Sequence, residues 1–143
     1  MFFVSLRKEC KRVADLTVKE QLSNELLILL RQMYHVERDM LFIGLIDVIN
    51  SVEQNLADFI VLAENATHLL APLDFFARLT KLAEAKNVPY VYTCKKKQLG
   101  WACHLSVGIS AISIKIGHSY FSEKINATKS MIISAALSST ITL

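Results

Sequence analysis

The spacing of apolar residues predicts helices that alternate with strands along the chain. In residues 17–34, apolar side chains recur every three or four positions, which is the period of a helix with one buried face. The members of this face are Leu22, Leu26, Leu29, Leu30 and Met33. Thr17 is a suitable N-cap, because Glu20 follows three residues later as in a capping box. We therefore expect a helix that begins at Thr17 and packs its leucine face inward.

The rest of the chain continues this alternation. Apolar runs at residues 40–43, 58–63 and 88–94 predict buried strands, and isoleucines that alternate with serines predict a longer strand over residues 107–116. Helical spacing marks the segments between and after these strands, which are residues 45–55, 72–87, 95–103 and 122–137. Strands separated by helices predict an α/β domain of three layers, with helices on both faces of the sheet.

The composition predicts one domain and indicates the cellular compartment of the protein. The chain has 143 residues, of which 52% are hydrophobic, and this predicts a single well-filled core. Its net charge of +3 permits a polyanionic partner without requiring one. Three cysteines without a C-x-x-C pair favour a reducing compartment. No window offers the roughly 18 apolar residues of a membrane span, so we expect a protein of the cytoplasm, the nucleus or both, without a membrane partner.

The residues needed for catalysis are not brought together by any recognisable motif. No histidine lies four positions from another histidine or from a cysteine, which is the spacing that would place two metal ligands on one helical face. The chain also lacks the glycine-rich phosphate loops and the nucleophile elbow of known enzyme classes. We therefore expect no enzyme activity, no cofactor, no metal site and no small-molecule substrate.

The stretch "FIGLIDVIN" places a glycine between a predicted strand and a predicted helix. Gly44 can adopt a positive φ, and the N-terminus of the following helix offers unpaired N–H groups to a phosphate or a nucleic-acid backbone. Asp47 in the first turn has a carboxylate that can accept hydrogen bonds from a base edge. The alternative is structural: Gly44 forms a turn, and Asp47 matches the helix dipole.

The second candidate feature is the run of three lysines at residues 95–97. Lysines bind phosphates as point charges and carry no sequence information, and the alternative is a solvated helix start. The aromatic rings of Tyr90, Tyr92 and Trp101 are able to stack on bases, and the strand period places both tyrosines on one face. Core packing is the better interpretation for most of these aromatic residues.

Three stretches taken together resemble the L7Ae/L30e/S12e/Gadd45-type RNA-binding domain. These are "FIVLAEN", "PLDFFARLTKLAEAKNVPYVYTCKKKQLGWAC" and "VGISAISI". The most specific part is K-N-V-P-Y-V-Y, followed by a lysine and by L-G-x-A at Leu99, Gly100 and Ala102. The resemblance covers residues 18–131. It implies an α-β-α sandwich around a four-stranded mixed sheet and the binding of kink-turn RNA, a sharply bent internal loop with tandem sheared G·A pairs. We expect the domain to span residues 17–137, with an N-terminal extension (1–16) and a C-terminal tail (138–143).

Within this family, the chain is most similar to the proteins that bind the selenocysteine insertion sequence (SECIS) of selenoprotein mRNAs. Its first helix ends "LLRQMY", its glycine junction reads Gly-Leu-x-acidic-Val, and the sheet continues as "LSVGISAIS" without the usual Arg-Pro-Val. This branch implies a role in selenocysteine incorporation during translation. Two alternatives stay open. One is a core protein of the U4 or the box C/D or H/ACA particles, whose length fits better, and the other is a protein-interaction module that has lost RNA binding.

The family's RNA-contacting motif is Gly-x-polar-Glu-x-x-Lys, and the resemblance places it at the glycine junction. Gly44 is retained and Asp47 replaces the glutamate, whereas Ile46 and Asn50 stand where a polar residue and a lysine are expected. The resemblance also implies contacts from the loops after the second strand and after the lysine helix. The expected RNA-binding residues are Gly44, Leu45, Ile46, Asp47, Asn50, Glu64, Asn65, Lys95, Lys96, Lys97, Ser106, Val107, Gly108 and Ile109. The implied partner is a structured RNA, together with the ribosome or other ribonucleoprotein components.

Overall fold

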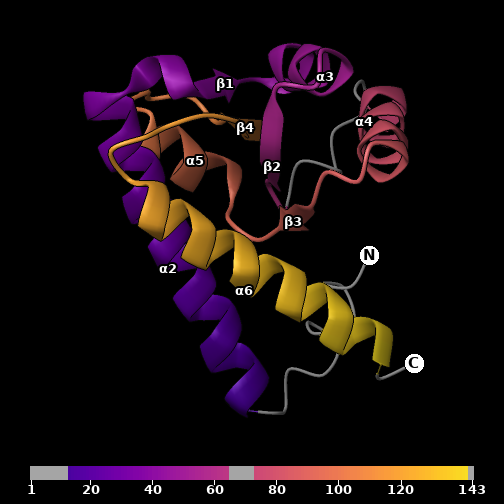
Figure 1. The fold of residues 1–143 in the computed structure, drawn as a ribbon. Helices are drawn as coiled ribbons and strands as arrows, with labels where there is room; N and C mark the ends of the chain where they lie inside the picture. The colour runs from indigo at the N-terminus through magenta and orange to yellow at the C-terminus, as the bar shows by residue number, and fades with distance from the viewer. Residues whose placement is uncertain (1–12, 65–72, 142–143) are drawn as a thin grey trace.

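The computed structural model describes residues 13–64 and 73–141, including the side chains of residues 20–64 and 77–134. These residues form one sheet with helices on both sides (Figure 1). In chain order the elements are α2 (Val13–Val36), the 3-10 turn η1 (Arg38–Met40), β1 (Leu41–Ile43), α3 (Leu45–Glu53), β2 (Ala57–Leu62), α4 (Leu73–Ala85), β3 (Tyr90–Tyr92), α5 (Lys96–Ala102), β4 (Ala111–Lys115) and α6 (Ser122–Ile141).

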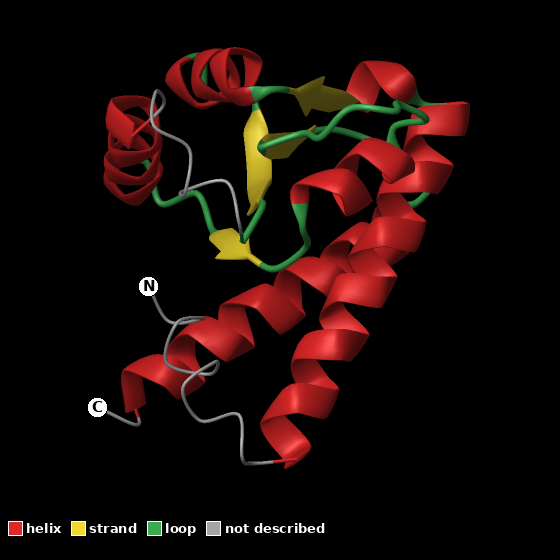
Figure 2. Cartoon of the chain, turned by 180° about the vertical axis from the view of Figure 1, so that it is seen from behind, coloured by secondary structure: helices red, strands yellow, loops and turns green. Residues whose placement is uncertain are grey.

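The sheet has four strands in the order β1-β4-β2-β3. Strand β4 pairs antiparallel with both β1 and β2, and β2 pairs parallel with β3. Helices α3 and α4 lie on one side of the sheet, and α2, α5 and α6 lie on the other, as the two opposite views show (Figures 1 and 2). The predicted fold class, a three-layer α-β-α sandwich with a four-stranded mixed sheet, is confirmed.

The first long helix buries the predicted leucine face but begins earlier than expected. The five apolar residues assigned to this face are each at most 2% exposed. Helix α2 starts at Val13, so Thr17 lies inside the helix and the predicted N-cap is wrong. The reason is that Ala14 and Leu16 are favourable helix residues, which extend the helix toward the N-terminus. Among the described helices, none combines the length and apolarity that crossing a bilayer requires.

Two strands are shorter than the sequence pattern predicts. Strand β4 begins only at Ala111, because Ile109 in the preceding loop bonds to a helix instead of the sheet: its N–H donates to the carbonyl of Lys96 at 3.0 Å. Strand β3 contains three residues and follows Pro89, which has no N–H to donate. Ser113 is fully buried in β4, and its Oγ lies 2.8 Å from the Oγ of Ser51 in α3, so its hydroxyl is satisfied inside the core.

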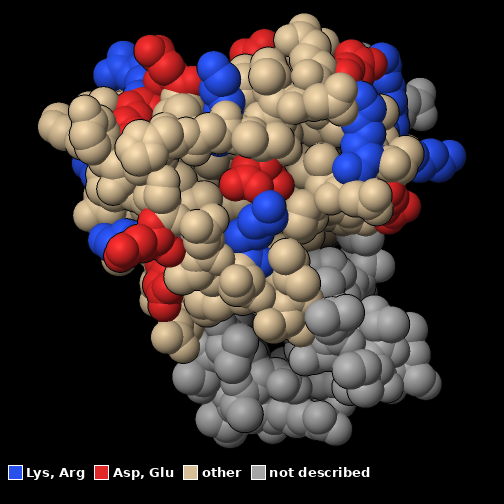
Figure 3. Space-filling model, viewed as in Figure 1, with Lys and Arg blue, Asp and Glu red and all other residues tan. Residues whose placement is uncertain are grey.

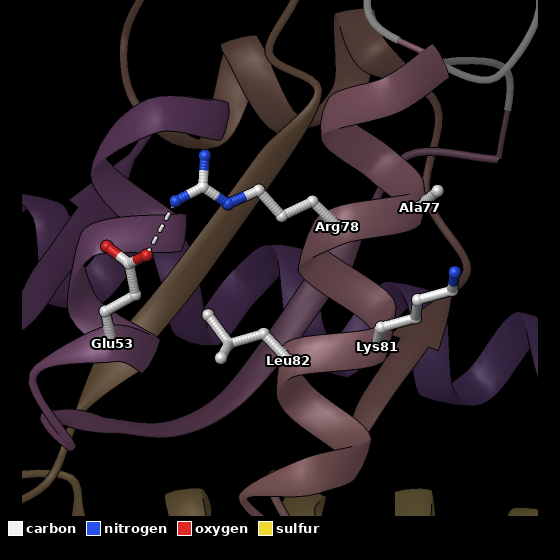
Figure 4. A pocket seen from close by; sticks show the side chains of 5 residues that line it. All are labelled: Glu53, Ala77, Arg78, Lys81 and Leu82. Carbon is white, nitrogen blue, oxygen red and sulfur yellow. Dashed lines mark hydrogen bonds and ion pairs between the residues drawn. The ribbon is translucent and has the colours of Figure 1, made fainter.

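Arg78 of α4 forms an ion pair at the end of α3 that lies away from Gly44. Arg78 Nη2 lies 2.7 Å from Glu53 Oε2, and these two residues line a shallow groove with Ala77, Lys81 and Leu82. Figure 4 shows Arg78 reaching toward Glu53 while Lys81 points away. This groove therefore contains a structural ion pair, and its basic residue is engaged within the fold.

Replacing Lys86 with methionine should lower the free energy of unfolding by about 0.5–1 kcal/mol. Lys86 Nζ donates to the carbonyl of Glu53 at 2.8 Å and to Asn55 Oδ1 at 3.0 Å, so it neutralises the partial negative charge where α3 ends. Urea unfolding monitored by circular dichroism measures the change. The matched control is Lys81→Met in α4, whose exposed side chain points away from Glu53. An equal loss in both variants would contradict this assignment.

Candidate nucleic-acid interface

The predicted strand–glycine–helix junction is present at Gly44. This residue has φ +98° and is the N-cap of α3, and its N–H donates to the carbonyl of Ala111 at 2.9 Å. A positive φ in this range strains residues that carry a Cβ, although no atom lies within 4 Å of the place where a Cβ would stand. Glycine is therefore required here by backbone conformation and not by lack of space.

Helix α3 turns three of the predicted site residues outward. Ile46 is 55% exposed, and Asp47 and Asn50 are also exposed. The opposite face of the helix, which includes Val48 and Val52, is buried. Because Asp47 lies in the first turn, its carboxylate interacts favourably with the helix dipole, and Ile46 beside it presents apolar surface. Leu45 is half-buried and packs against the core.

One edge of the sheet brings the predicted segments together. The N–H of Ala63 donates to the carbonyl of Ser110 at 2.9 Å, and the N–H of Glu64 donates to the carbonyl of Cys94 at 2.7 Å. With the bond from Gly44 to Ala111, these contacts join the ends of β1, β2 and β3 to the start of β4. Glu64 is half-buried at this edge, and Asn65 lies outside the described residues.

The three lysines lie at the start of α5, immediately after β3 at the same edge. Lys95 is the N-cap of α5, and its backbone N–H donates to Gln98 Oε1 at 2.8 Å. Lys95 and Lys97 are exposed, whereas Lys96 is half-buried next to Gly108. Lys95 and Lys97 are therefore exposed to solvent at the end of the sheet that also carries the junction.

Gly100 seats the loop of residues 105–109 on α5. A Cβ at Gly100 would lie 2.1 Å from the carbonyl oxygen of Val107, so the loop backbone occupies the space that any other residue would need. The N–H of Leu105 donates to the carbonyl of Gly100 at 2.8 Å. Val107 is 64% exposed, and Ser106 and Gly108 are also exposed. Ile109 is 5% exposed, so its side chain belongs to the core and its neighbours form the outer surface of the loop.

The aromatic residues divide between the core and the surface. Tyr90 and Tyr92 share a strand face as predicted, with ring centroids 6.4 Å apart in an edge-on arrangement. Tyr90 is buried and donates its hydroxyl to Glu84 Oε2 at 2.7 Å, and burial followed by this bond raises its pKa. Trp101 differs because half of its surface is exposed, and the guanidinium of Arg31 lies over its ring. Core packing therefore holds for both tyrosines and not for Trp101.

The two described cysteines are buried thiols. Burial raises the pKa of Cys94 to about 12 and that of Cys103 to about 11, so both thiols stay protonated and weakly nucleophilic at neutral pH. In the part of the chain that the structure describes, no three side chains among His, Cys, Asp and Glu are grouped so that they hold a metal ion.

Charged residues do not form one continuous field on the face drawn in Figure 3. Basic and acidic side chains are interspersed there, and uncharged surface separates them. This agrees with a net charge of only +3 for the whole chain. Attraction of a polyanion to this face would therefore depend on local groups of charges rather than on a uniform potential.

Comparison with known proteins gives matches over the same region. Residues 30–120 match the Ribosomal protein L7Ae/L30e/S12e/Gadd45 family. NHP2-like protein 1 of Xenopus laevis is 35% identical over 96 residues, which cover 67% of this chain and 70% of that relative. NHP2-like protein 1 of Rattus norvegicus is 36% identical over 73 residues, which cover 51% of this chain and 54% of the rat protein.

A solved structure also matches this chain. The Giardia lamblia 15.5kD RNA binding protein superimposes with a TM-score of 0.70 and 25% sequence identity, covering 80% of this chain and 90% of the Giardia chain. The family match begins within α2 and ends beyond β4, and so includes every strand of the sheet and the junction at Gly44. The chain therefore belongs to the ribosomal protein L7Ae/L30e/S12e/Gadd45 family.

Proposed function

We propose that this protein binds a structured RNA containing a kink-turn-like internal loop. The observation that carries the proposal is the meeting of three features at one sheet edge: the Gly44 junction, the lysines that begin α5, and the exposed loop seated on Gly100. Membership of the family supports it, as does the similarity to a Giardia protein named for RNA binding. The interface would comprise the fourteen residues predicted from the sequence, with Ile109 contributing through its backbone and Asn65 from outside the described part.

Each part of this interface has a distinct chemical role. The N–H groups at the start of α3 suit a phosphate or a base edge, and the Asp47 carboxylate accepts hydrogen bonds from an exposed guanine. Lys95 and Lys97 neutralise phosphates without reading sequence. Ile46 and Val107 offer the apolar contacts on which bases extruded from an RNA loop commonly rest.

Two departures from the family motif predict weaker binding than in relatives that keep it. Ile46 removes a polar group expected to contact a base, and a good base contact is worth about 1–3 kcal/mol. Asn50 removes a positive charge expected to face the phosphates, so the affinity should also depend less steeply on salt. Both side chains are exposed on α3, where their replacement is tolerated by the fold.

Sequence resemblance favours the SECIS element as the RNA, and U4 and box C/D or H/ACA RNAs are the alternatives. The relatives and the structural neighbour described above carry names that do not refer to selenocysteine. A panel of these RNAs, titrated at one salt concentration, ranks them directly. The highest affinity for a SECIS element would support a role in selenocysteine incorporation beside ribosomal components, whereas the reverse order would assign the chain to another ribonucleoprotein.

The proposal is tested by a mobility-shift titration with two RNAs. One contains a kink-turn or SECIS element, and the other has its sheared G·A pairs replaced by Watson–Crick pairs. We expect at least a roughly tenfold preference for the first RNA, which is the size of one good contact. Equal affinities would overturn specific recognition. Failure to bind either RNA, with retained capture of a protein partner, would favour the interaction module.

Replacing Asn50 with lysine should strengthen binding to the kink-turn RNA and steepen its salt dependence. The exposed position lies one turn after Asp47 on the same helix, where the motif expects a lysine. One added phosphate contact should increase the slope of log K against log salt by about 0.7–0.9. Fluorescence anisotropy at several salt concentrations measures this slope. The control Ser134→Lys adds the same charge on α6, and an equal effect there would assign the gain to net charge.

A further inference from the structure

A second surface combines positive charge with aromatic rings on the opposite side of the sheet from α3. Its residues come from the last turns of α2, from η1 and from the end of α5. We call it the cation–aromatic patch, and it consists of Arg31, Tyr34, His35, Arg38, Trp101 and His104. Sequence reasoning did not identify this surface, and the RNA interface proposed above does not include it.

The first half of the patch is a guanidinium stacked on an indole. The Cζ atom of Arg31 lies 4.1 Å from the centroid of the Trp101 ring, and Nη1 donates to the backbone carbonyl of Trp101 at 2.7 Å. Trp101 is nevertheless 50% exposed. The bond and the stack therefore hold the two planar groups in place while much of the indole still faces solvent.

The second half repeats this arrangement with smaller rings. Arg38 Cζ lies 4.4 Å from the centroid of the Tyr34 ring, and the ring of His104 lies 5.5 Å from that of Tyr34. The ring of His35 follows at 6.4 Å from that of His104. Four planar groups thus lie next to one another, and His35, Arg38 and His104 are exposed.

The charged groups that act on His104 within the patch are cationic, while Glu37 and Asp39 flank Arg38 along the chain. Partial desolvation lowers the pKa of His104, and Arg31, His35 and Arg38 lower it further, so the charges that act on it are cationic. The nearby carboxylate of Glu37 accepts hydrogen bonds from the hydroxyl of Ser119 and the N–H of Tyr120. Within the described part of the chain, the ion pairs involve neither arginine of the patch.

Exposed rings and guanidinium planes suit single-stranded RNA. Unpaired bases stack on aromatic and guanidinium planes, and the phosphates between them are attracted to nearby cations. An acidic peptide would use the charges but would leave the planar surfaces without a matching group. The composition of the patch therefore favours an unpaired nucleic-acid strand over an acidic protein segment.

The patch is also continuous with the proposed RNA interface. Lys97 and Trp101 are four residues apart on α5, so they lie on one helical face, about 6 Å apart along the axis. Exposed Leu105 and Val107 follow in the loop that is seated on the same helix. An RNA strand that contacts the lysines can therefore also reach this apolar surface and the stacked planes of the patch.

We propose that the cation–aromatic patch binds a single-stranded segment of RNA that extends from the kink-turn-like element. This inference rests on the proposed function, because it assumes that the folded part of the same RNA occupies the edge at Gly44. The patch would add affinity for natural transcripts with unpaired flanks and would not affect a minimal RNA.

The test compares two RNAs and three proteins by fluorescence anisotropy. One RNA is the kink-turn element alone, and the other carries a single-stranded flank of about eight nucleotides at each of its two ends. The flank should raise the affinity of the wild-type protein about tenfold, because stacking of one base is worth roughly that factor. The variants Arg38→Gln and Trp101→Leu should lose this gain while binding the minimal RNA as the wild type does. Urea unfolding verifies that both variants are folded.

The outcomes separate this inference from the proposed function. The inference would be overturned if the flanked RNA bound the wild type no more tightly than the minimal RNA, or if both variants retained the gain in affinity. Binding of a polyglutamate peptide without any gain from the flank would also overturn it in favour of an acidic protein partner. If the minimal RNA is not bound, an unattached single strand is titrated instead. Its binding by the wild type and loss in both variants would support the patch even though the kink-turn proposal had failed.

Discussion

Replacing Gly100 with alanine is expected to destabilise the fold and to weaken RNA binding in the same variant. The added methyl group would lie 2.1 Å from the carbonyl oxygen of Val107, which is a backbone atom and cannot rotate away. The loop of residues 105–109 must then move off α5, together with the bond from the N–H of Leu105 to the carbonyl of Gly100. Overpacking of this kind costs about 1–3 kcal/mol. Urea unfolding gives the stability, and anisotropy with the kink-turn RNA gives the affinity.

The sign of this change makes the experiment decisive. A glycine inside a helix is normally less stable than alanine by about 0.5–1 kcal/mol, so propensity alone would make Gly100→Ala stabilising. The contact with Val107 predicts the opposite sign. Ser130→Ala on the exposed face of α6 serves as the control, and it should leave stability within about 0.5 kcal/mol of the wild type. A Gly100→Ala protein that is more stable than the wild type would show that the loop is not seated as described.

The double variant Lys95→Gln, Lys97→Gln should lose most of the salt-dependent part of RNA binding. Both side chains are exposed at the sheet edge that carries the Gly44 junction, and both are proposed to contact phosphates. Loss of two contacts should reduce the slope of log K against log salt by about 1.4–1.8, and the affinity at low salt should fall about tenfold or more. Stability should change little, because neither ammonium group is buried.

The comparison variant for this measurement is Lys81→Gln, Lys124→Gln. It removes the same formal charge from exposed positions on α4 and α6, away from the proposed interface. We expect its salt dependence to stay close to that of the wild type. If both double variants lose affinity equally, the lysines of α5 contribute only to the net charge, and the proposed interface loses its electrostatic component.

The parts of the fold that depend on local periodicity were predictable. The leucine spacing of α2 identified a face that is fully buried, because three- and four-residue spacing follows directly from helix geometry. The L-G-x-A motif carried the family resemblance, and the structure gives it a physical meaning: Gly100 leaves room for the loop backbone, and Leu99 and Ala102 are buried beneath it.

Features that depend on contacts between distant segments were not predictable. The length of β4 is set by a bond from Ile109 to Lys96 that withdraws Ile109 from the sheet, and alternation of residue types does not reveal this bond. Arg31 and Trp101 are separated by 70 positions, and no motif links one to the other. Trp101 looks like a core residue by type alone, and only the packing of α2 against α5 shows that it lies at the surface beneath a guanidinium.

The position of β4 has a consequence for the synthesis of the protein. This strand is the last in the sequence, yet it lies inside the sheet and is the only strand with which β1 pairs among the described residues. While the ribosome is still translating the residues before Ala111, β1 has no strand beside it, and β2 can pair only with β3. The apolar residues of β1 therefore remain without their strand partner until late in elongation. Such long-range pairing slows folding, because the chain between β1 and β4 must be ordered before the two strands can pair.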